Sequence, residues 1–154
     1  MALSLRKATV VIGLFVLASC TSVGRIQQTE PVRTTKFTGS NKAVAQCVQQ
    51  RVGGKVQDEG FGEKYIVYDS AKGLEAWGLT HYAFTIARTG PDQGVVEWRV
   101  VSPQRGTDPY SEQLRRSSSP GAVPPPQGTL ADAAIRRFWD PAQDCAARAK
   151  SLSP

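Results

Sequence analysis

The chain has 154 residues and a net charge of +6, which allows one domain with a modest hydrophobic core. Its basic residues are scattered, and the densest pairs, Arg115-Arg116 and Arg136-Arg137, have no interleaved aromatic side chains, so we expect no nucleic-acid partner. Because His81 is the single histidine and no two cysteines lie close together, we expect no metal site and no cofactor.

The first nineteen residues have the three-part organisation of a secretory signal. Arg6 and Lys7 give a basic start, residues 8–17 form a ten-residue apolar run, and Ala18 and Ser19 are small. At about 1.5 Å per residue, this run spans roughly half of a ~30 Å bilayer core, too little for a transmembrane helix. A short buried helix of a cytosolic domain is the alternative, but the basic start and the small residues favour a signal peptide.

Leu17, Ala18, Ser19 and Cys20 then match, position by position, the Leu-small-small-Cys lipobox. Residues 1–20 therefore resemble the signal peptides of bacterial lipoproteins. The resemblance implies that the leader, residues 1–19, is removed and that the Cys20 sulfur carries a diacylglycerol. It also implies an acylated new amine, and two or three acyl chains together hold a protein firmly on a membrane.

The resemblance also bears on location. In many Gram-negative lipoproteins an aspartate directly after the lipidated cysteine retains the protein at the inner membrane, and Thr21 is not aspartate. We therefore expect a lipid-anchored protein of the outer membrane that faces the periplasm, with the inner membrane and the cell surface as alternatives.

The mature chain begins with a polar stretch. Thr21 to Gly39 is rich in threonine and has no hydrophobic period, which predicts that residues 20–39 form the lipidated cysteine and a flexible tether. Residues 40–154 then form a single domain.

A helix is predicted first in this domain. Ser40 or Asn41 can cap it, and Gly53-Gly54 ends it after Val52. Val44, Cys47, Val48 and Val52 recur at helical spacing, so Cys47 is predicted to face the core.

Strands follow the first helix. Lys64–Asp69 is a short run of β-branched and aromatic residues, which predicts a strand. Residues 79–88 and 95–102 alternate around a turn, which predicts an antiparallel hairpin. The side chains predicted on its buried face are Tyr82, Phe84, Ile86, Val96, Trp98 and Val100.

Residues 103–128 hold six of the ten prolines and no hydrophobic period, so we expect an exposed, proline-rich loop. After it, Thr129 can cap a helix over residues 130–139. Asp140-Pro141 predicts a turn and a helical restart, with Asp140 as cap. The apolar stripe of this last helix is Ala142, Cys145, Ala146 and Ala149.

With Cys20 assigned to lipid, Cys47 and Cys145 remain as an even pair in an oxidising compartment, which predicts a disulfide. Two separate buried thiols, or a metal pair, are the alternatives. The predicted fold is a small two-layer α+β domain. It has an antiparallel sheet of three to four strands, with N- and C-terminal helices packed on one face.

Few residues suggest chemistry. Gly53-Gly54 and Gly60-Phe61-Gly62 lack phosphate-binding spacing and are predicted turns. His81 lies opposite the apolar face of its strand, with no nucleophile and base beside it in the sequence. Trp77, between Ala76 and Gly78, is the residue that we expect to contact a partner.

We therefore expect a non-enzymatic envelope lipoprotein, an accessory or assembly component of an envelope complex. Its partners are the membrane, through the lipid anchor, and an envelope protein. The alternative is a ligand- or inhibitor-type module that binds a hydrolase or a glycan through Trp77 and residues 103–128.

Overall fold

The computed structural model describes residues 21–69, 74, 79, 81–101, 109–116, 121 and 127–152. Cys20, Trp77 and most of the proline-rich loop, residues 103–128, lie outside the described residues. The elements in chain order are α1 (Thr21–Gln27), β1 (Arg33–Thr38), α2 (Asn41–Val52), β2 (Lys55–Glu59), β3 (Lys64–Asp69), β4 (His81–Gly90), β5 (Gln93–Val101), α3 (Pro109–Arg116), α4 (Leu130–Ala134), the π-helix η2 (Ile135–Trp139), α5 (Asp140–Ala147) and α6 (Ala149–Leu152).

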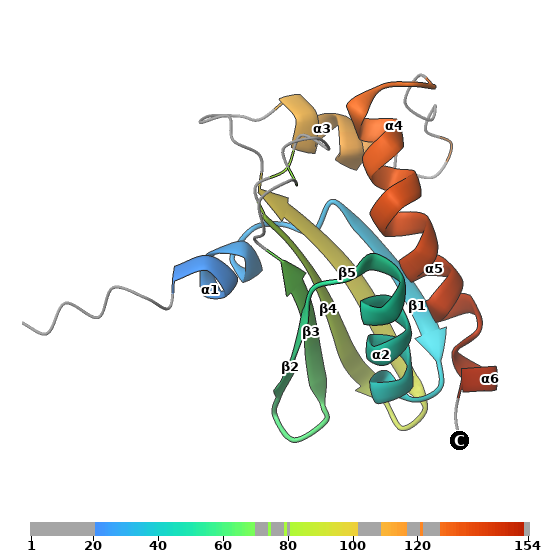
Figure 1. Cartoon of the computed structure of the whole chain (residues 1–154). Helices are drawn as coiled ribbons and strands as arrows, with labels where there is room; N and C mark the ends of the chain where they lie inside the picture. The colour runs from blue at the N-terminus through green and yellow to red at the C-terminus, as the bar shows by residue number, and fades with distance from the viewer. Residues whose placement is uncertain are drawn as a thin grey trace, which may run out of the picture.

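One antiparallel sheet organises the domain (Figure 1). Its five strands lie in the order β1-β5-β4-β3-β2, so the last four strands of the chain form a meander and β1 joins it beside β5. Helix α2 connects the two edge strands, β1 and β2. The predicted α+β class is confirmed, with one or two strands more than the sequence predicted.

The two predicted helices cover one face of this sheet. Helices α2 and α5 lie side by side over the strands (Figure 1), and their apolar side chains share one core with the sheet. Trp98 is central to it: its ring stacks on Phe84 at 6.0 Å and on Trp139 at 6.3 Å between centroids. Aromatic pairs of this kind add roughly 0.5–1.5 kcal/mol beyond the area they bury.

Local signals place α2 and β3 as predicted. The Ser40 hydroxyl accepts a hydrogen bond from the Ala43 N–H at 3.3 Å, and Gly53 ends the helix at a φ of 88°. Glycine adopts such a φ without strain, which explains the clean stop. Strand β3 has the predicted bounds, and β4 and β5 form the predicted hairpin with Tyr82, Phe84 and Ile86 buried.

The prediction of a flexible tether over residues 20–39 is wrong for its described part. Strand β1 pairs with β5 along its whole length, from Arg33 opposite Trp98 to Thr38 opposite Gln93. The sequence gives no hydrophobic signal for this strand, because Phe37 is its one buried side chain. A strand that buries so few side chains shows no hydrophobic alternation in the sequence.

Helix α1 covers part of the opposite face of the sheet. Ile26, which is 1% exposed, packs against Ile66 and Ala83, and these three residues form a second, smaller core. The Arg99 side chain fixes the chain after this helix, because its Nε donates to the Thr29 carbonyl at 2.9 Å. Helices therefore lie on both faces, and not on one face alone.

The sequence predicted that residues 103–128 form an exposed loop, but part of this region is buried. Helix α3 lies within residues 103–128, and its Leu114 is fully buried in the main core. Two ion pairs from Glu112, to Arg115 at 3.0 Å and to Arg116 at 2.9 Å, support so short a helix. The prolines around it masked a short amphipathic helix of eight residues.

The C-terminal helix does not break at Asp140-Pro141, so the prediction that Asp140 caps a new helix is wrong. Residues 130–147 run on through the π-helix, where the Asp140 N–H donates to the Ile135 carbonyl five residues back. In a regular α-helix, Pro141 would clash with the carbonyl four residues before it. The wider π turn relieves that clash and keeps the helix continuous.

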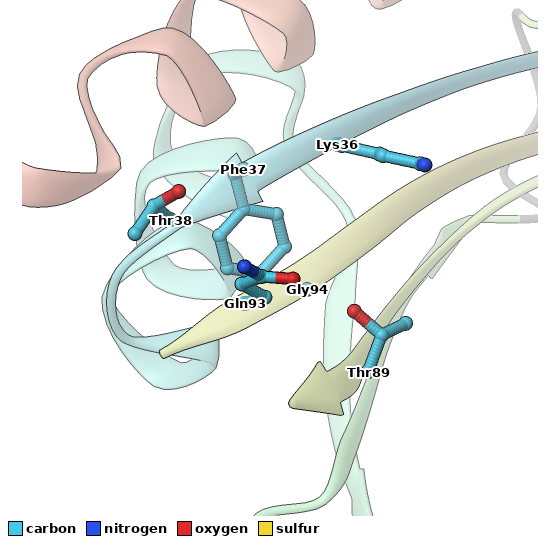
Figure 2. Close-up of a pocket in the computed structure, with 6 residues that line it drawn as sticks. All are labelled: Lys36, Phe37, Thr38, Thr89, Gln93 and Gly94. Atoms are coloured by element: carbon cyan, nitrogen blue, oxygen red, sulfur yellow. The ribbon is translucent and has the colours of Figure 1, made fainter. Parts of the chain in front are cut away.

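Gly94 makes room for Phe37. The Phe37 ring lies against Gly94 (Figure 2), and a Cβ placed there would come 2.2 Å from the Phe37 Cζ atom.

We therefore expect Gly94→Ala to lower the free energy of unfolding by about 1–3 kcal/mol through overpacking. Urea unfolding measures this. Gly90→Ala in the same hairpin meets its nearest atom at 3.7 Å and is the matched control; equal stabilities for both variants would contradict this packing.

Candidate functional site

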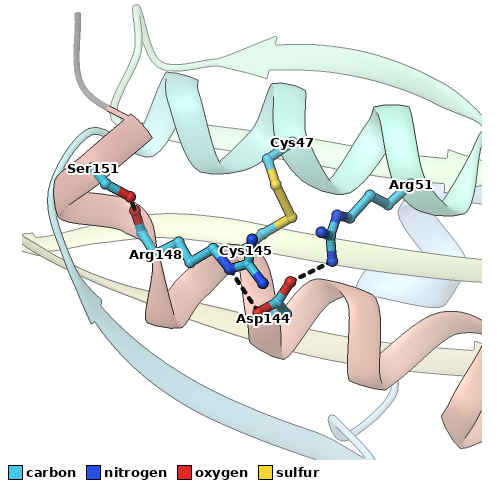
Figure 3. The surroundings of a disulfide bond; sticks show 6 residues. All are labelled: Cys47, Arg51, Asp144, Cys145, Arg148 and Ser151. Carbon is cyan, nitrogen blue, oxygen red and sulfur yellow. Dashed lines mark hydrogen bonds and ion pairs between the residues drawn. A yellow bond between two sulfur atoms is a disulfide. The ribbon is translucent and has the colours of Figure 1, made fainter.

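A disulfide between Cys47 and Cys145 joins α2 to α5 (Figure 3). Their Cα atoms are 5.9 Å apart, within the usual range for a disulfide. Cys145 is fully buried and Cys47 is half-buried, so the bond lies where the two helices meet above the sheet. The predicted pairing is present.

An ion-pair network lies beside this disulfide (Figure 3). The Asp144 carboxylate forms ion pairs with Arg51 of α2 and with Arg148, the C-cap residue of α5, the latter at 2.9 Å. The side chains of Arg51 and Asp144 are 42% and 33% exposed, so this pair contributes at most about 1 kcal/mol. The network orients the two helices more than it stabilises them.

Arg137 makes a second contact between the same helices. Its guanidinium donates to the carbonyls of Arg51 at 3.0 Å and Val52 at 3.3 Å, at the C-terminal end of α2. These carbonyls have no partner within their own helix, and a cation there also suits the helix dipole. The disulfide, Asp144 and Arg137 together fix α2 against the C-terminal helix.

Two of the pKa shifts belong to these packed positions. Burial raises the pKa of the Tyr82 hydroxyl, which donates to the Val52 carbonyl at 3.5 Å and so stays protonated. Burial also raises the pKa of the Asp140 carboxyl, while the nearby Arg33 opposes that rise. Both shifts follow from packing between the helices and the sheet.

The residues predicted to act from the sequence are not brought together. Cys20 and Trp77 lie outside the described residues. His81 is half-buried at the start of β4, where it pairs with Val101 across the hairpin. Within the described ranges no three histidine, cysteine or acidic side chains gather in a way that could hold a metal ion.

A small cavity lies where β1 meets the β4–β5 turn (Figure 2). Its volume is about 240 Å³, and Phe37, Gly94 and the exposed side chains of Lys36, Thr89 and Gln93 line it. The Phe37 ring is 5% exposed and offers no face to a ligand. Because ligand sites usually hold a few fixed polar groups at a volume of about 300–1,000 Å³, this cavity is a surface depression.

The β2–β3 hairpin was not predicted from the sequence. The turn at residues 60–62 was predicted, but not the strand before it. Phe61 is fully exposed at the tip, and its φ of 56° is one that non-glycine residues rarely adopt. Phe between two glycines was the available signal. Strained, exposed positions of this kind often serve contacts.

Comparisons of the chain with protein-family models, with curated proteins and with solved structures gave no match. Nor is any helix in the described part of the chain long and apolar enough to cross a membrane.

The disulfide closes a loop over a sequence separation of 98 residues. Chain entropy gives such a loop roughly 4–5 kcal/mol, so Cys47→Ser or Cys145→Ser should lower the free energy of unfolding by up to that amount. The double variant should lose no more than either single variant, because all three remove one bond. Urea unfolding measures the loss, and the reduced wild type is the control. Unlinked Cys47 and Cys145 peptides in an alkylated, non-reduced digest would contradict the bond.

Proposed function

We propose that the protein is a lipid-anchored lipoprotein of the bacterial envelope, held at Cys20 in the outer membrane and facing the periplasm. Its domain is non-enzymatic and acts as an accessory or assembly component of an envelope complex. The observation that carries this proposal is the Cys47–Cys145 disulfide behind a lipobox leader.

The disulfide supports an exported location. Structural disulfides persist in oxidising compartments such as the periplasm and are rare in the cytosol. The bond is built between two helices of the core, and a small domain of this size gains a large share of its stability from it. The leader and the disulfide are independent features, and both favour a location outside the cytosol, beyond the inner membrane.

Helix α1 supports a position close to the membrane. It begins at Thr21, directly after Cys20, and Ile26 and the Thr29 carbonyl are held on the sheet. A lipid on Cys20 would therefore be only a few residues from the folded domain. The domain then lies at the membrane surface, where its partners would be other membrane-bound components.

Lipidation is the first test. Cells grown with a palmitate analogue should label the wild-type chain, and Cys20→Ser should lose the label because the thioether can no longer form. Thr21→Ser, which leaves the cysteine in place, is the matched control. Equal labelling of wild type and Cys20→Ser would refute the anchor.

The partner is the second test. Cross-linking in intact envelopes, followed by purification of a tagged chain, should return a membrane complex with at least one other envelope protein. A second copy carrying a different tag distinguishes contacts between copies from contacts with another protein. Recovery of a soluble hydrolase or a glycan, with no membrane protein, would replace the assembly role by that of an inhibitor or ligand module.

A further inference from the structure

Strand β2 is an open edge of the sheet. Its first four residues, from Lys55 to Asp58, are all exposed, and among the described residues no backbone hydrogen bond reaches it except from β3. Val56 is 40% exposed on this strand, and the fully exposed Phe61 lies at its end. An edge with free backbone groups and exposed apolar side chains is a template for strand pairing.

The register decides which backbone groups are free. The Arg88 N–H donates to the Glu63 carbonyl at 2.9 Å, so that carbonyl points toward β4. Across the planar trans peptide the Lys64 N–H points the opposite way, toward β2. The backbone groups of successive residues in a strand point to alternate sides, so Lys64, Ile66 and Tyr68 of β3 bond to β2. Their partners on β2 are Glu59, Gln57 and Lys55, which therefore turn their backbone groups toward β3. Val56 and Asp58 therefore turn their N–H and C=O groups outward.

The charges along β2 are self-complementary about Gln57. In an antiparallel pair centred on this residue, Lys55 of each copy lies opposite Glu59 of the other. Opposite charges at such positions attract, at roughly 0.2–1 kcal/mol a pair. A pairing centred on Asp58 would set this carboxylate against its own copy, and one centred on Val56 would leave Lys55 opposite Gln57. The charges select the Gln57 register.

We propose that β2 pairs antiparallel with β2 of a second copy of this chain, centred on Gln57, so that two sheets join into one. Val56 and Asp58 of opposite copies then exchange their outward backbone hydrogen bonds. The turn with Phe61 comes opposite Gly53 of the other copy, where a Cβ would meet no atom within 4 Å. The contact is short, so the dimer forms reversibly.

Cross-linking through an introduced thiol tests this register. Gln57 meets its own copy at a non-hydrogen-bonded pair, with Cα atoms about 4.5 Å apart, a distance that a disulfide can bridge. The two copies of Lys55 are about 13 Å apart along the strands. In the whole chain with Cys20→Ser, mild oxidation should therefore link Gln57→Cys at least tenfold faster than Lys55→Cys. Equal rates for these two exposed positions, after correction for thiol alkylation rates, would overturn the proposal.

Charge exchange tests self-pairing without disturbing the backbone. Added to Gln57→Cys, Lys55→Glu should slow the cross-link about threefold or more, because it sets like charges opposite each other twice. Glu59 also pairs with Lys64 of its own chain at 2.6 Å, so adding Glu59→Lys together with Lys64→Glu should restore the rate. Val56→Pro should abolish the fast cross-link while the chain stays folded, since its N–H points outward. No slowing with Lys55→Glu, or no recovery in the exchanged variant, would overturn the Gln57-centred pairing of two copies.

Discussion

The domain depends on holding two helices against one face of a thin sheet. A chain of this size buries one modest core, so each helix contact is a large part of its stability. Helix α2 follows the first strand, while α5 lies near the C-terminal end, after the other four strands. The Cys47–Cys145 bond joins them, and Asp144 and Arg137 add contacts to the C-terminal end of α2. Trp98 of β5 stacks on Trp139 of η2, so this aromatic contact depends on the C-terminal helix remaining packed on the sheet.

The elements that could be predicted from the sequence are those with local signals. Helix α2 has a serine cap and a glycine stop, and the β4–β5 hairpin alternates because it lies in the centre of the sheet. Both edge strands escaped prediction for one physical reason. Hydrophobic period reports burial, and β1 buries only Phe37 while β2 buries no side chain at all. What defines these strands is pairing with a distant partner, which no local window contains.

The candidate site, too, was predictable only where the sequence carries a local signal. The disulfide could be predicted, because two cysteines on apolar helical stripes leave few arrangements. The contact of Arg137 with the end of α2 could not, since it joins residues more than eighty positions apart through backbone carbonyls. Likewise, Pro141 indicated a break by the rules of a regular helix. Only the π turn before it, set by the packing of Phe138 and Trp139 into the core, keeps the helix intact.

The two edges of the sheet are not equivalent. At the end of β1 the chain is tightly enclosed: a Cβ on Gly39 would come 2.7 Å from the Ala149 carbonyl oxygen of α6. Helices α5 and α6 both contact this strand. Strand β2 contacts α2 as well, but among the described residues no backbone hydrogen bond reaches its outward groups. Proteins commonly protect a bare edge with charged side chains, prolines, bulges or a covering segment. On β2 the charges have opposite signs at its two ends, so a copy centred on Gln57 gains two attractions between Lys55 and Glu59, while a copy centred on Asp58 sets two carboxylates opposite each other.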